Sequence, residues 1–346
     1  MLSQKQITEI REHLERAQNP VFFFDNDADG LCSFLLLQRF IGRGRGVAIK
    51  SFPDLTVNYF RKVHEFNADY IFILDKHSVE KKFFEKADQI NIPIVWIDHH
   101  LTNNKIPSFV NYYNPLIDEP DSYIPVASVC YEVTKKRDDL WLAVTGCISD
   151  GVVPDFYGEF KKKCSELSLD SKNAFEIYFN SGIGKVIKIF NFALKDRTTN
   201  VVNMLRFLMR VKSPYEVLEK TSKNHTMHER FEYINQRYNK FLERAKKIGG
   251  GCDKILFFKY GGELSISSDL AGALSYAFPE KVIVVGYVSG AKINISVRGK
   301  NIREKVLRAI EGFEGATGGG HEEAVGVKIM IDDWEKFKER LEKEVG

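Results

Sequence analysis

VFFFDNDADGLCS, residues 21–33, joins an apolar run directly to three closely spaced aspartates. The residues at 21–24 favour β structure and predict a buried strand. Asp25, Asp27 and Asp29 follow at once, and Gly30 opens a helical pattern. Ligands bind at the carboxyl ends of strands in open α/β sheets, and crowded carboxylates repel one another unless cations neutralise them. The stretch therefore predicts a metal site at the end of a buried strand.

Strand-like and helical patterns alternate through the N-terminal part of the chain. The expected strands are residues 21–24, 47–52, 70–74, 94–97 and 109–112, and helical patterns such as 31–40 and 79–87 lie between most of them. Such alternation is typical of an α/β fold with a doubly wound, mostly parallel sheet. Acidic residues or histidines end three of the strands, so we expect these groups to line one edge of the sheet.

The rest of the chain changes character twice. Residues 123–134 and 138–148 predict two helices, residues 157–245 predict a run of helices, and three glycines at 249–251 indicate a linker. A smaller α/β unit follows, with an expected hairpin at 254–259 and 263–266, strands at 282–288, 292–297 and 323–330, and helices at 268–277, 302–311 and 334–345. The expected domains are residues 1–154, a basic helical insert at 155–248, and residues 252–346.

The composition is that of a globular protein. The 346 residues are 44% hydrophobic and 28% charged, with a net charge of +3. No apolar run approaches the roughly 20 residues that a membrane-spanning helix needs. The five cysteines form no Cys-x-x-Cys pair, which favours free thiols in a reducing compartment. We therefore expect a cytoplasmic protein with no membrane partner.

Further candidate metal ligands follow the opening stretch: Asp75, the run Asp98-His99-His100, and Asp150. A single aspartate at a strand end is most often a helix cap or a turn former. All of these groups together favour a carboxylate-rich site with imidazole, which suits Mn²⁺ or Mg²⁺ better than structural Zn²⁺. So many carboxylates can hold two ions about 3.5–4 Å apart, an arrangement that hydrolyses phosphoesters.

A glycine-rich run near the C-terminus, ATGGGHEEA at 316–324, predicts an anion site. The backbone amides of Gly318, Gly319 and Gly320 can approach a phosphate closely. His321 adds a donor, and Arg298 can bond a phosphate through two N–H groups. The alternative is a flexible glycine turn with a chance histidine.

The helical insert carries an excess of positive charge. Residues 155–250 hold 19 lysines and arginines against 11 aspartates and glutamates. Basic residues lie among Phe190, Phe192 and Phe207, and they are Lys185, Lys188, Lys195, Arg197, Arg206, Arg210 and Lys212. Basic side chains beside aromatic rings are typical of single-strand nucleic-acid binding. The alternative is that the phenylalanines pack between the helices while the lysines form a solvated face.

Four motifs in order, DNDADG, IDHH, GCISDG and GGGH, resemble the signatures of the DHH phosphoesterase superfamily with its DHH-associated C-terminal domain. Within it, the chain is most similar to RecJ-like single-strand exonucleases of the archaeal type. The oligoribonuclease and pyrophosphatase branches typically carry a histidine where this chain has Phe23, whereas the RecJ branch has an acid or histidine at the position of Asp25. This spacing favours the nuclease branch.

The resemblance implies roles for individual residues. Two Mn²⁺ ions, or Mg²⁺ in their place, would be held by six ligands, with Asp75 between the ions: Asp25, Asp27, Asp29, Asp75, His99 and Asp150. Among the catalytic residues, Asp98 would ligate a metal ion or orient a neighbouring ligand, and His100 would contact the scissile phosphate. Arg298 and His321, with Gly318, Gly319 and Gly320, would hold the phosphate of the terminal nucleotide. The chain departs from bacterial RecJ at Lys76-His77, where small residues are common; His77 is then either an extra contact or a solvent-facing side chain.

The expected function is a two-metal exonuclease with its active site in the cleft between the domains. It would release nucleoside monophosphates from single-stranded DNA or RNA in replication or repair, with replication or repair proteins and a second copy of the chain as further partners. One alternative is a phosphodiesterase of short oligoribonucleotides or cyclic dinucleotides. Bacterial RecJ carries an extra oligonucleotide-binding domain that this sequence does not show, and such a domain would favour long substrates. Another alternative is a replication-associated scaffold without catalysis.

Overall fold

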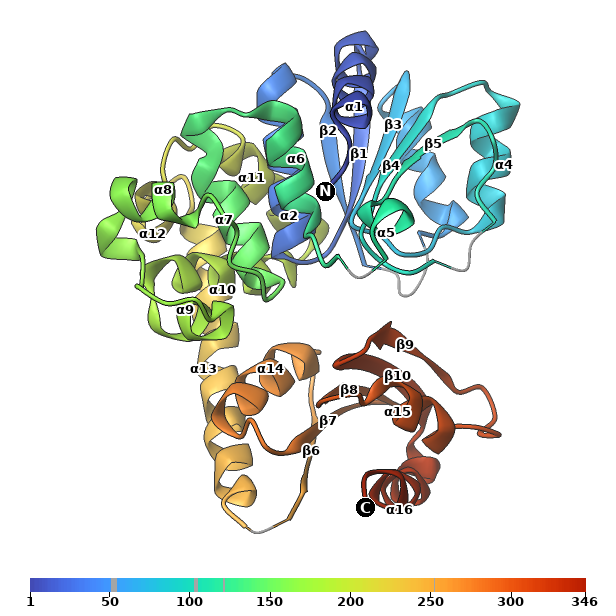
Figure 1. The fold of residues 1–346 in the computed structure, drawn as a ribbon, viewed down its shortest axis with the longest axis vertical. Helices are drawn as coiled ribbons and strands as arrows, with labels where there is room; N and C mark the ends of the chain where they lie inside the picture. The colour runs from blue at the N-terminus through green and yellow to red at the C-terminus, as the bar shows by residue number, and fades with distance from the viewer. Residues whose placement is uncertain (51–54, 103–104, 121, 252) are drawn as a thin grey trace. The chain divides into compact units, whose positions relative to one another are not determined.

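The computed structural model describes residues 1–50, 55–102, 105–120, 122–251 and 253–346 (Figure 1). The end of the strand expected at 47–52 lies partly outside these residues. The chain forms two compact units, Met1–Phe231 and Glu232–Gly346. The division falls inside the long helix α13, His225–Gly249. The expected three-part division into domains stays a prediction.

The first unit is built on a five-stranded parallel sheet in the order β2-β1-β3-β4-β5. The strands are β1 Pro20–Asp25, β2 Arg45–Ile49, β3 Tyr70–Leu74, β4 Ile94–Ile97 and β5 Val110–Tyr113. The chain moves outward from β1 to β2 and then returns to the other side of β1 as β3. The gap between the ends of β1 and β3 is therefore the switch point of a doubly wound sheet, where such folds bind ligands.

Helices cover both faces of this sheet, and the side chains of β1 alternate between the two faces. Phe23 faces the core formed with Phe60 and with Phe83 of α4, Lys81–Gln89. Phe22 and Phe24 face the other way and pack on Phe34 of α2, Ala28–Ile41. Figure 1 shows α2 and α4 on opposite sides of the sheet. The predicted doubly wound α/β fold is confirmed.

Two of the remaining helices of this unit were predicted, at 123–134 and 138–148. The N-terminal helix α1, Gln4–Arg16, is capped by Ser3 in a reciprocal bond with Gln6. The others are α3 Arg61–Glu65, α5 Pro115–Asp118, α6 Val126–Thr134 and α7 Leu140–Ser149. The helix predicted to start at residue 123 instead begins at Val126, because Pro125 is its N-cap and the residue before a proline avoids the helical region.

The insert is helical as predicted. It comprises α8 Tyr157–Lys163, α9 Ala174–Asn180, α10 Gly182–Leu194, α11 Thr198–Leu208 and α12 Pro214–Leu218, followed by α13. Arg39 at the end of α2 holds the insert to the sheet domain: its guanidinium donates to the carbonyls of Leu208 and Val211 and forms an ion pair with the buried Asp139 carboxylate. A buried ion pair with backbone acceptors fixes this junction in one geometry.

The second unit contains a mixed sheet in the order β6-β7-β8-β10-β9. Its strands are β6 Ile255–Gly261, β7 Val282–Ser289, β8 Lys292–Arg298, β9 Thr317–His321 and β10 Ala324–Met330. Helix α14, Ser267–Ala277, packs against β7 and β8. Helices α15 Arg303–Ala309 and α16 Trp334–Val345 contribute Val306, Trp334 and Phe337 to a core with Ile295 and Val325. The smaller C-terminal α/β domain is confirmed.

Two details of this unit correct the sequence-based expectations. The hairpin at 254–259 and 263–266 does not form, because β6 pairs in parallel with β7 and residues 263–266 lead into α14. The hydroxyl of Tyr260 accepts a bond from the Ile266 amide at 2.7 Å in that connection. The second correction is β9, which runs through Gly318–Gly320 and pairs with β10, although glycines are poor strand formers.

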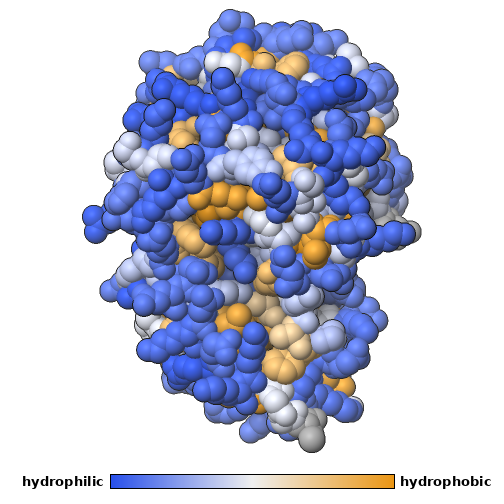
Figure 2. Space-filling view, turned by 90° about the vertical axis from the view of Figure 1, so that its left-hand side faces the viewer, coloured by the Kyte–Doolittle hydropathy of each residue, from blue (hydrophilic) through white to orange (hydrophobic). Residues whose placement is uncertain are grey.

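The surface in the view of Figure 2 is mostly hydrophilic, with apolar residues in small groups. Among the helices of the described residues, none combines the length and the apolar character needed to cross a membrane.

Candidate metal site and anion site

The turn after β1 places the first aspartates at the switch point. β1 ends at Asp25, and Asp27 caps α2 by accepting the Gly30 amide at 2.9 Å. A Cβ at Gly30 would lie 2.6 Å from the carbonyl oxygen of Asp25, so only glycine allows the helix to start this close to the strand. The short D-x-D-x-D-G turn is thus what crowds the carboxylates together.

Asp29 is buried and tied to another helix. One carboxylate oxygen accepts the Val126 amide at 2.8 Å and the other accepts the Ala127 amide at 2.9 Å, both at the start of α6. The amino terminus of a helix stabilises a negative charge. In α7, a Cβ at Gly146 would lie 2.9 Å from Asp29 Oδ1, so that glycine makes room for the carboxylate.

Asp75 follows β3 in a strained conformation. Its φ of 57° is in the left-handed region, which costs a non-glycine residue free energy and is found most often at functional sites. Its side chain is buried. Burial and the nearby Asp27 charge raise the pKa of Asp75 well above its usual range.

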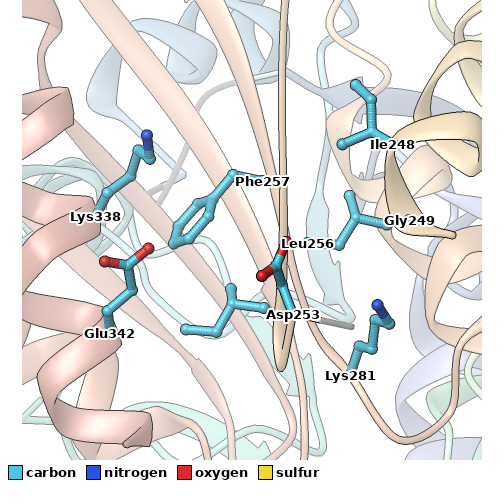
Figure 3. A pocket seen from close by; sticks show the side chains of 9 residues that line it. Ile248, Gly249, Asp253, Leu256, Phe257, Lys281, Lys338 and Glu342 are labelled. Atoms are coloured by element: carbon cyan, nitrogen blue, oxygen red, sulfur yellow. The ribbon is translucent and has the colours of Figure 1, made fainter. Parts of the chain in front are cut away.

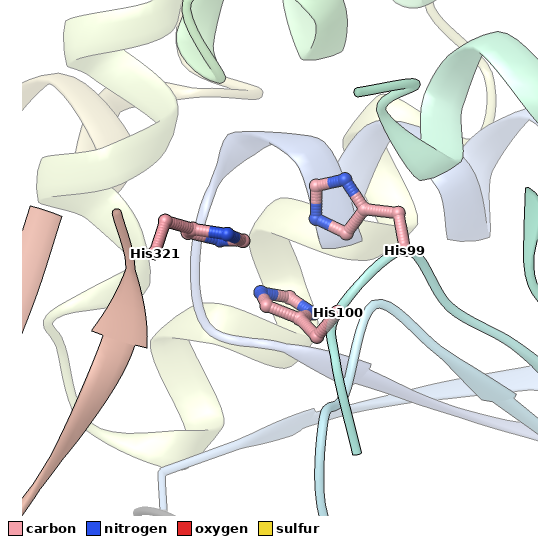
Figure 4. A group of neighbouring side chains, drawn as sticks. All are labelled: His99, His100 and His321. Carbon is pink, nitrogen blue, oxygen red and sulfur yellow. The ribbon is translucent and has the colours of Figure 1, made fainter. Parts of the chain in front are cut away.

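The run after β4 brings two histidines to the same edge (Figure 4). His99 Nε2 lies 3.3 Å from Asp75 Oδ1 and 3.5 Å from Asp150 Oδ2. Asp98 Oδ1 accepts from His100 Nδ1 at 2.8 Å. Burial lowers the pKa of His100, but the Asp98 charge and this bond outweigh it and raise the pKa to about 9. His100 is therefore a cation at neutral pH in the metal-free protein.

Tyr123 is a member of the site that the sequence analysis missed. Its hydroxyl donates to Asp150 Oδ2 at 3.0 Å, and its ring lies 5.2 Å from the ring of His99. Asp150 caps the end of α7, whereas Tyr123 precedes α6. No motif marks a tyrosine in this connection, so only the tertiary fold reveals it.

Two groups of ligand atoms share Asp75. Asp29, Asp75 and His99 each offer one atom, and all three atoms lie within 4.8 Å of one another. Asp75, Asp98 and His100 form a second such group. The predicted edge of carboxylates and imidazoles therefore forms within one unit of the chain, between the ends of β1, β3 and β4.

The residues fit divalent cations in three ways. Burial and the charges of Asp25 and Asp150 raise the pKa of Asp27 to about 6, and burial and the charge of Asp75 raise that of Asp29. Such mutual repulsion is relieved by a bound cation. Asp98 Oδ2 is buried and has no hydrogen-bond partner among the described residues. The donors are carboxylate oxygens and imidazole nitrogens, which suit Mn²⁺ and Mg²⁺.

Lys76 and His77 distinguish this edge further. Lys76 is fully buried, and its ammonium lies 2.9 Å from Asp25 Oδ1. His77 is half-buried, with its ring 5.6 Å from that of His100. Burial and the cationic His100 lower the pKa of His77.

The predicted anion-binding residues lie in the second unit at the ends of β8 and β9. Arg298 donates to Ser268 Oγ at 2.9 Å, in the first turn of α14. His321 ends β9 (Figure 4). A Cβ at Gly320, whose φ is 137°, would lie 2.3 Å from the Ala324 carbonyl oxygen, so the strand pairing itself requires this glycine. A Cβ at Gly319 would meet nothing within 4 Å, so packing does not explain that glycine.

Other candidate features do not join these sites. The phenylalanines Phe190 and Phe192 are buried and Phe207 is half-buried, so stacking of Phe190 and Phe192 on bases is excluded, because packing between the helices covers them. A cavity of about 190 Å³ in the second unit is lined by residues such as Phe257, Lys281 and Lys338 and by none of the predicted site residues (Figure 3).

Comparisons with known proteins agree with the geometry. Residues 21–148 match the model of the DHH family, N-terminal domain. A search of curated protein sequences gave no match. RecJ of Thermus thermophilus in complex with Mn²⁺ superposes with a TM-score of 0.70 at 18% identity, over 98% of this chain and 54% of that protein.

Two further solved structures share the fold. An exonuclease RecJ bound to manganese has a TM-score of 0.63 at 17% identity, over 98% of this chain and 93% of its own. CDC45 from Entamoeba histolytica has a TM-score of 0.53 at 10% identity, over 98% of both chains. The chain spans about half the length of the Thermus RecJ, and at these identities the likeness establishes the fold.

Proposed function

We propose, on the premise that residues 21–148 are a DHH-family domain within a RecJ-like fold, that this protein is a metal-dependent exonuclease of single-stranded DNA or RNA. It hydrolyses the terminal phosphodiester bond: the P–O bond breaks, water supplies the new oxygen, and a nucleoside monophosphate leaves. Its setting is replication or repair, with nucleic acid and replication proteins as partners.

One observation carries the proposal: Asp29, Asp75 and His99 each bring one ligand atom to the switch point of the sheet, within 4.8 Å of one another, and Asp150 lies 3.5 Å from His99. Cations bound there would supply a water of lowered pKa and charge stabilisation at the phosphate. In this proposal Mn²⁺, with Mg²⁺ as the alternative, is held by Asp27, Asp29, Asp75, His99 and Asp150.

In this proposal the remaining residues at this edge bind the phosphate or orient the metal ligands. Asp98 occupies His100 Nδ1, so Nε2 is the ring nitrogen left to contact a phosphate oxygen, as a donor while the ring is protonated. Tyr123 holds the Asp150 carboxylate in one orientation through its hydroxyl. The amides at the start of α6 fix Asp29, so the position of this ligand depends on packed helices rather than on a flexible loop.

The second unit binds the terminal phosphate in this proposal. Arg298 lies beside the first turn of α14, where its guanidinium donates to Ser268 Oγ. Gly319 leaves room for an anion where a side chain would stand, and His321 adds a donor beside it.

The test is digestion of single strands labelled at either end, with DNA and RNA and with Mn²⁺ and Mg²⁺ compared. Asp98→Ala is expected to lower the rate by at least about 10²-fold, since it frees His100 from its partner. Asp170→Ala, an exposed residue of the insert, is the matched control. Full activity of Asp98→Ala contradicts the site assignment. Faster cleavage of dinucleotides than of long strands contradicts the exonuclease and favours a short-substrate phosphodiesterase.

A further inference from the structure

Lys76 is a buried lysine among the aspartates and histidines at the ends of β1, β3 and β4. It belongs to the largest fully buried side chains of the described residues, and every other member of that group is a phenylalanine or a tryptophan. A buried ammonium is costly unless an anion pairs with it. A lysine that follows a strained residue at the end of β3 therefore has its burial compensated by specific partners.

Asp25 is one of those partners. The ammonium lies 2.9 Å from Asp25 Oδ1, within hydrogen-bond distance. The backbone of Lys76 is also fixed, because its carbonyl accepts the buried Trp96 indole N–H at 2.8 Å. The pair therefore joins the end of β1 to the end of β3 across the switch point.

Asp25 also differs from the other paired carboxylates of the edge. In the described part of the chain its partner is a lysine, whereas the partners of Asp75, Asp98 and Asp150 in the ion pairs of the edge are histidines. The side chain of Asp25 is 33% exposed, whereas those of Asp75 and Asp98 are almost completely buried. A carboxylate whose charge is already matched by a lysine gains less from a bound cation than a carboxylate without such a partner.

We infer that Lys76 is a built-in cation that takes Asp25 as its counter-ion, so that Asp25 positions Lys76 and the metal ions are held without it. The inference rests on the proposed function and revises the sequence-based assignment of Asp25 as a ligand. The charge of Asp25 is one of those that repel Asp27. The ammonium of Lys76 beside Asp25 offsets part of this repulsion, which the metal ions would otherwise have to neutralise.

The experiment measures Mn²⁺ binding without substrate, on metal-free protein, by calorimetric titration and by elemental analysis after dialysis. Asp25→Asn is expected to bind the same number of Mn²⁺ ions as the unmodified protein, with a Kd changed by less than about threefold. Asp75→Asn, which removes the shared ligand, is expected to lose at least about 100-fold in affinity. Loss of an ion, or a tenfold weaker Kd, in Asp25→Asn overturns the inference.

A second measurement tests the pair itself. Lys76→Met leaves the Asp25 charge without its partner and is expected to lower the thermal midpoint of the metal-free protein by at least about 6 °C. The double variant Asp25→Asn with Lys76→Met is expected to recover at least half of that loss, because the unpaired charge is gone. Lys86→Met on the exposed face of α4 is the control. A double variant no more stable than Lys76→Met overturns the pairing.

The two measurements separate this inference from the proposed function. If the unmodified protein binds no Mn²⁺, both fail. If it binds Mn²⁺ and Asp75→Asn does not, while Asp25→Asn loses as much as Asp75→Asn, the metal site stands and only the role of Lys76 is refuted. If Lys76→Met does not fold, Asp25→Asn and the double variant still decide the question.

Discussion

The two sheets of this protein present opposite chemistry at their functional ends. The parallel sheet brings aspartates and histidines from three strand ends and two helix ends to one edge. The mixed sheet presents Arg298 and His321 beside a glycine-lined strand. The parallel sheet concentrates ligands because all of its strands end on the same side, whereas the antiparallel strands of the other alternate in direction. The first arrangement suits cations, and the second suits an anion.

Among the substitutions at the proposed cation site, Asp75→Asn is expected to have the largest effect. Because Asp75 belongs to both ligand groups, its loss is expected to lower Mn²⁺ affinity by at least about 100-fold and hydrolysis by at least about 10³-fold. Calorimetric titration and the digestion assay measure the two effects. Asp88→Asn, an exposed aspartate of α4, is the control. Near-normal Mn²⁺ binding by Asp75→Asn would refute the shared-ligand site.

The anion side should respond differently. Arg298→Ala is expected to slow hydrolysis by about 10²-fold, the loss typical of one charged donor at a phosphate, with Mn²⁺ affinity unchanged. Steady-state kinetics and metal titration on the same preparation check both statements, and Arg308→Ala on α15 is the control. A parallel fall in Mn²⁺ affinity would mean that the two regions are not chemically independent.

The repulsion at the cation edge predicts how pH affects the metal-free protein. The pKa of Asp27 is raised from 3.8 to about 6, so between these values the folded state binds more protons than the unfolded state. Its stabilising contribution is therefore complete below pH 3.8 and is lost as the pH rises through 6, by up to about 1.4 kcal/mol per pH unit. Chemical unfolding from pH 4 to pH 7 measures the slope.

Metal ions should reverse this loss. At pH 7, Mn²⁺ at 100 times its Kd is expected to raise the free energy of unfolding by about 2.7 kcal/mol per ion. Asp75→Asn should show a flatter pH dependence, since one of the repelling carboxylates is gone. An identical pH dependence of Asp75→Asn and the unmodified protein, both without metal, would contradict the mutual repulsion.

The smallest effect is expected at Tyr123. Tyr123→Phe removes only the hydroxyl that orients Asp150, so hydrolysis is expected to fall by about three- to tenfold, in line with one neutral hydrogen bond. The rate with Mn²⁺ measures the change, and Tyr215→Phe on the exposed surface of the insert is the control. A loss above 100-fold would give Tyr123 a direct role at the phosphate.

Local signals explain why so much of the first sheet could be predicted. Each strand is a short run of β-forming residues, so all five strands were identified in their approximate positions, and after β1 the acids and Gly30 also mark the turn. Asp25, Asp75 and Asp98 were then placed at one edge by the rule that parallel strands end on the same side. Nothing beyond neighbouring residues was needed.

The features that were missed depend on distant parts of the chain. Asp29 is bonded by amides 97 and 98 residues away, and the bonds of Lys76 to Asp25 and Trp96 also join distant parts of the chain. β9 was missed because its glycines disfavour strands locally, while pairing with β10 imposes the extended form. Residues 263–266 were assigned to a hairpin that parallel pairing of β6 with β7 excludes.

The bonds from α6 to Asp29 have one more consequence. The amide protons of Val126 and Ala127 point at a carboxylate of the proposed cation site. Their nuclear magnetic resonance frequencies depend on the electron density of the oxygens they approach, which changes when a diamagnetic cation such as Mg²⁺ draws on the same carboxylate, whereas paramagnetic Mn²⁺ would broaden both signals. These two protons are therefore a spectroscopic reporter built into the backbone, able to follow occupancy without a substrate or a substitution.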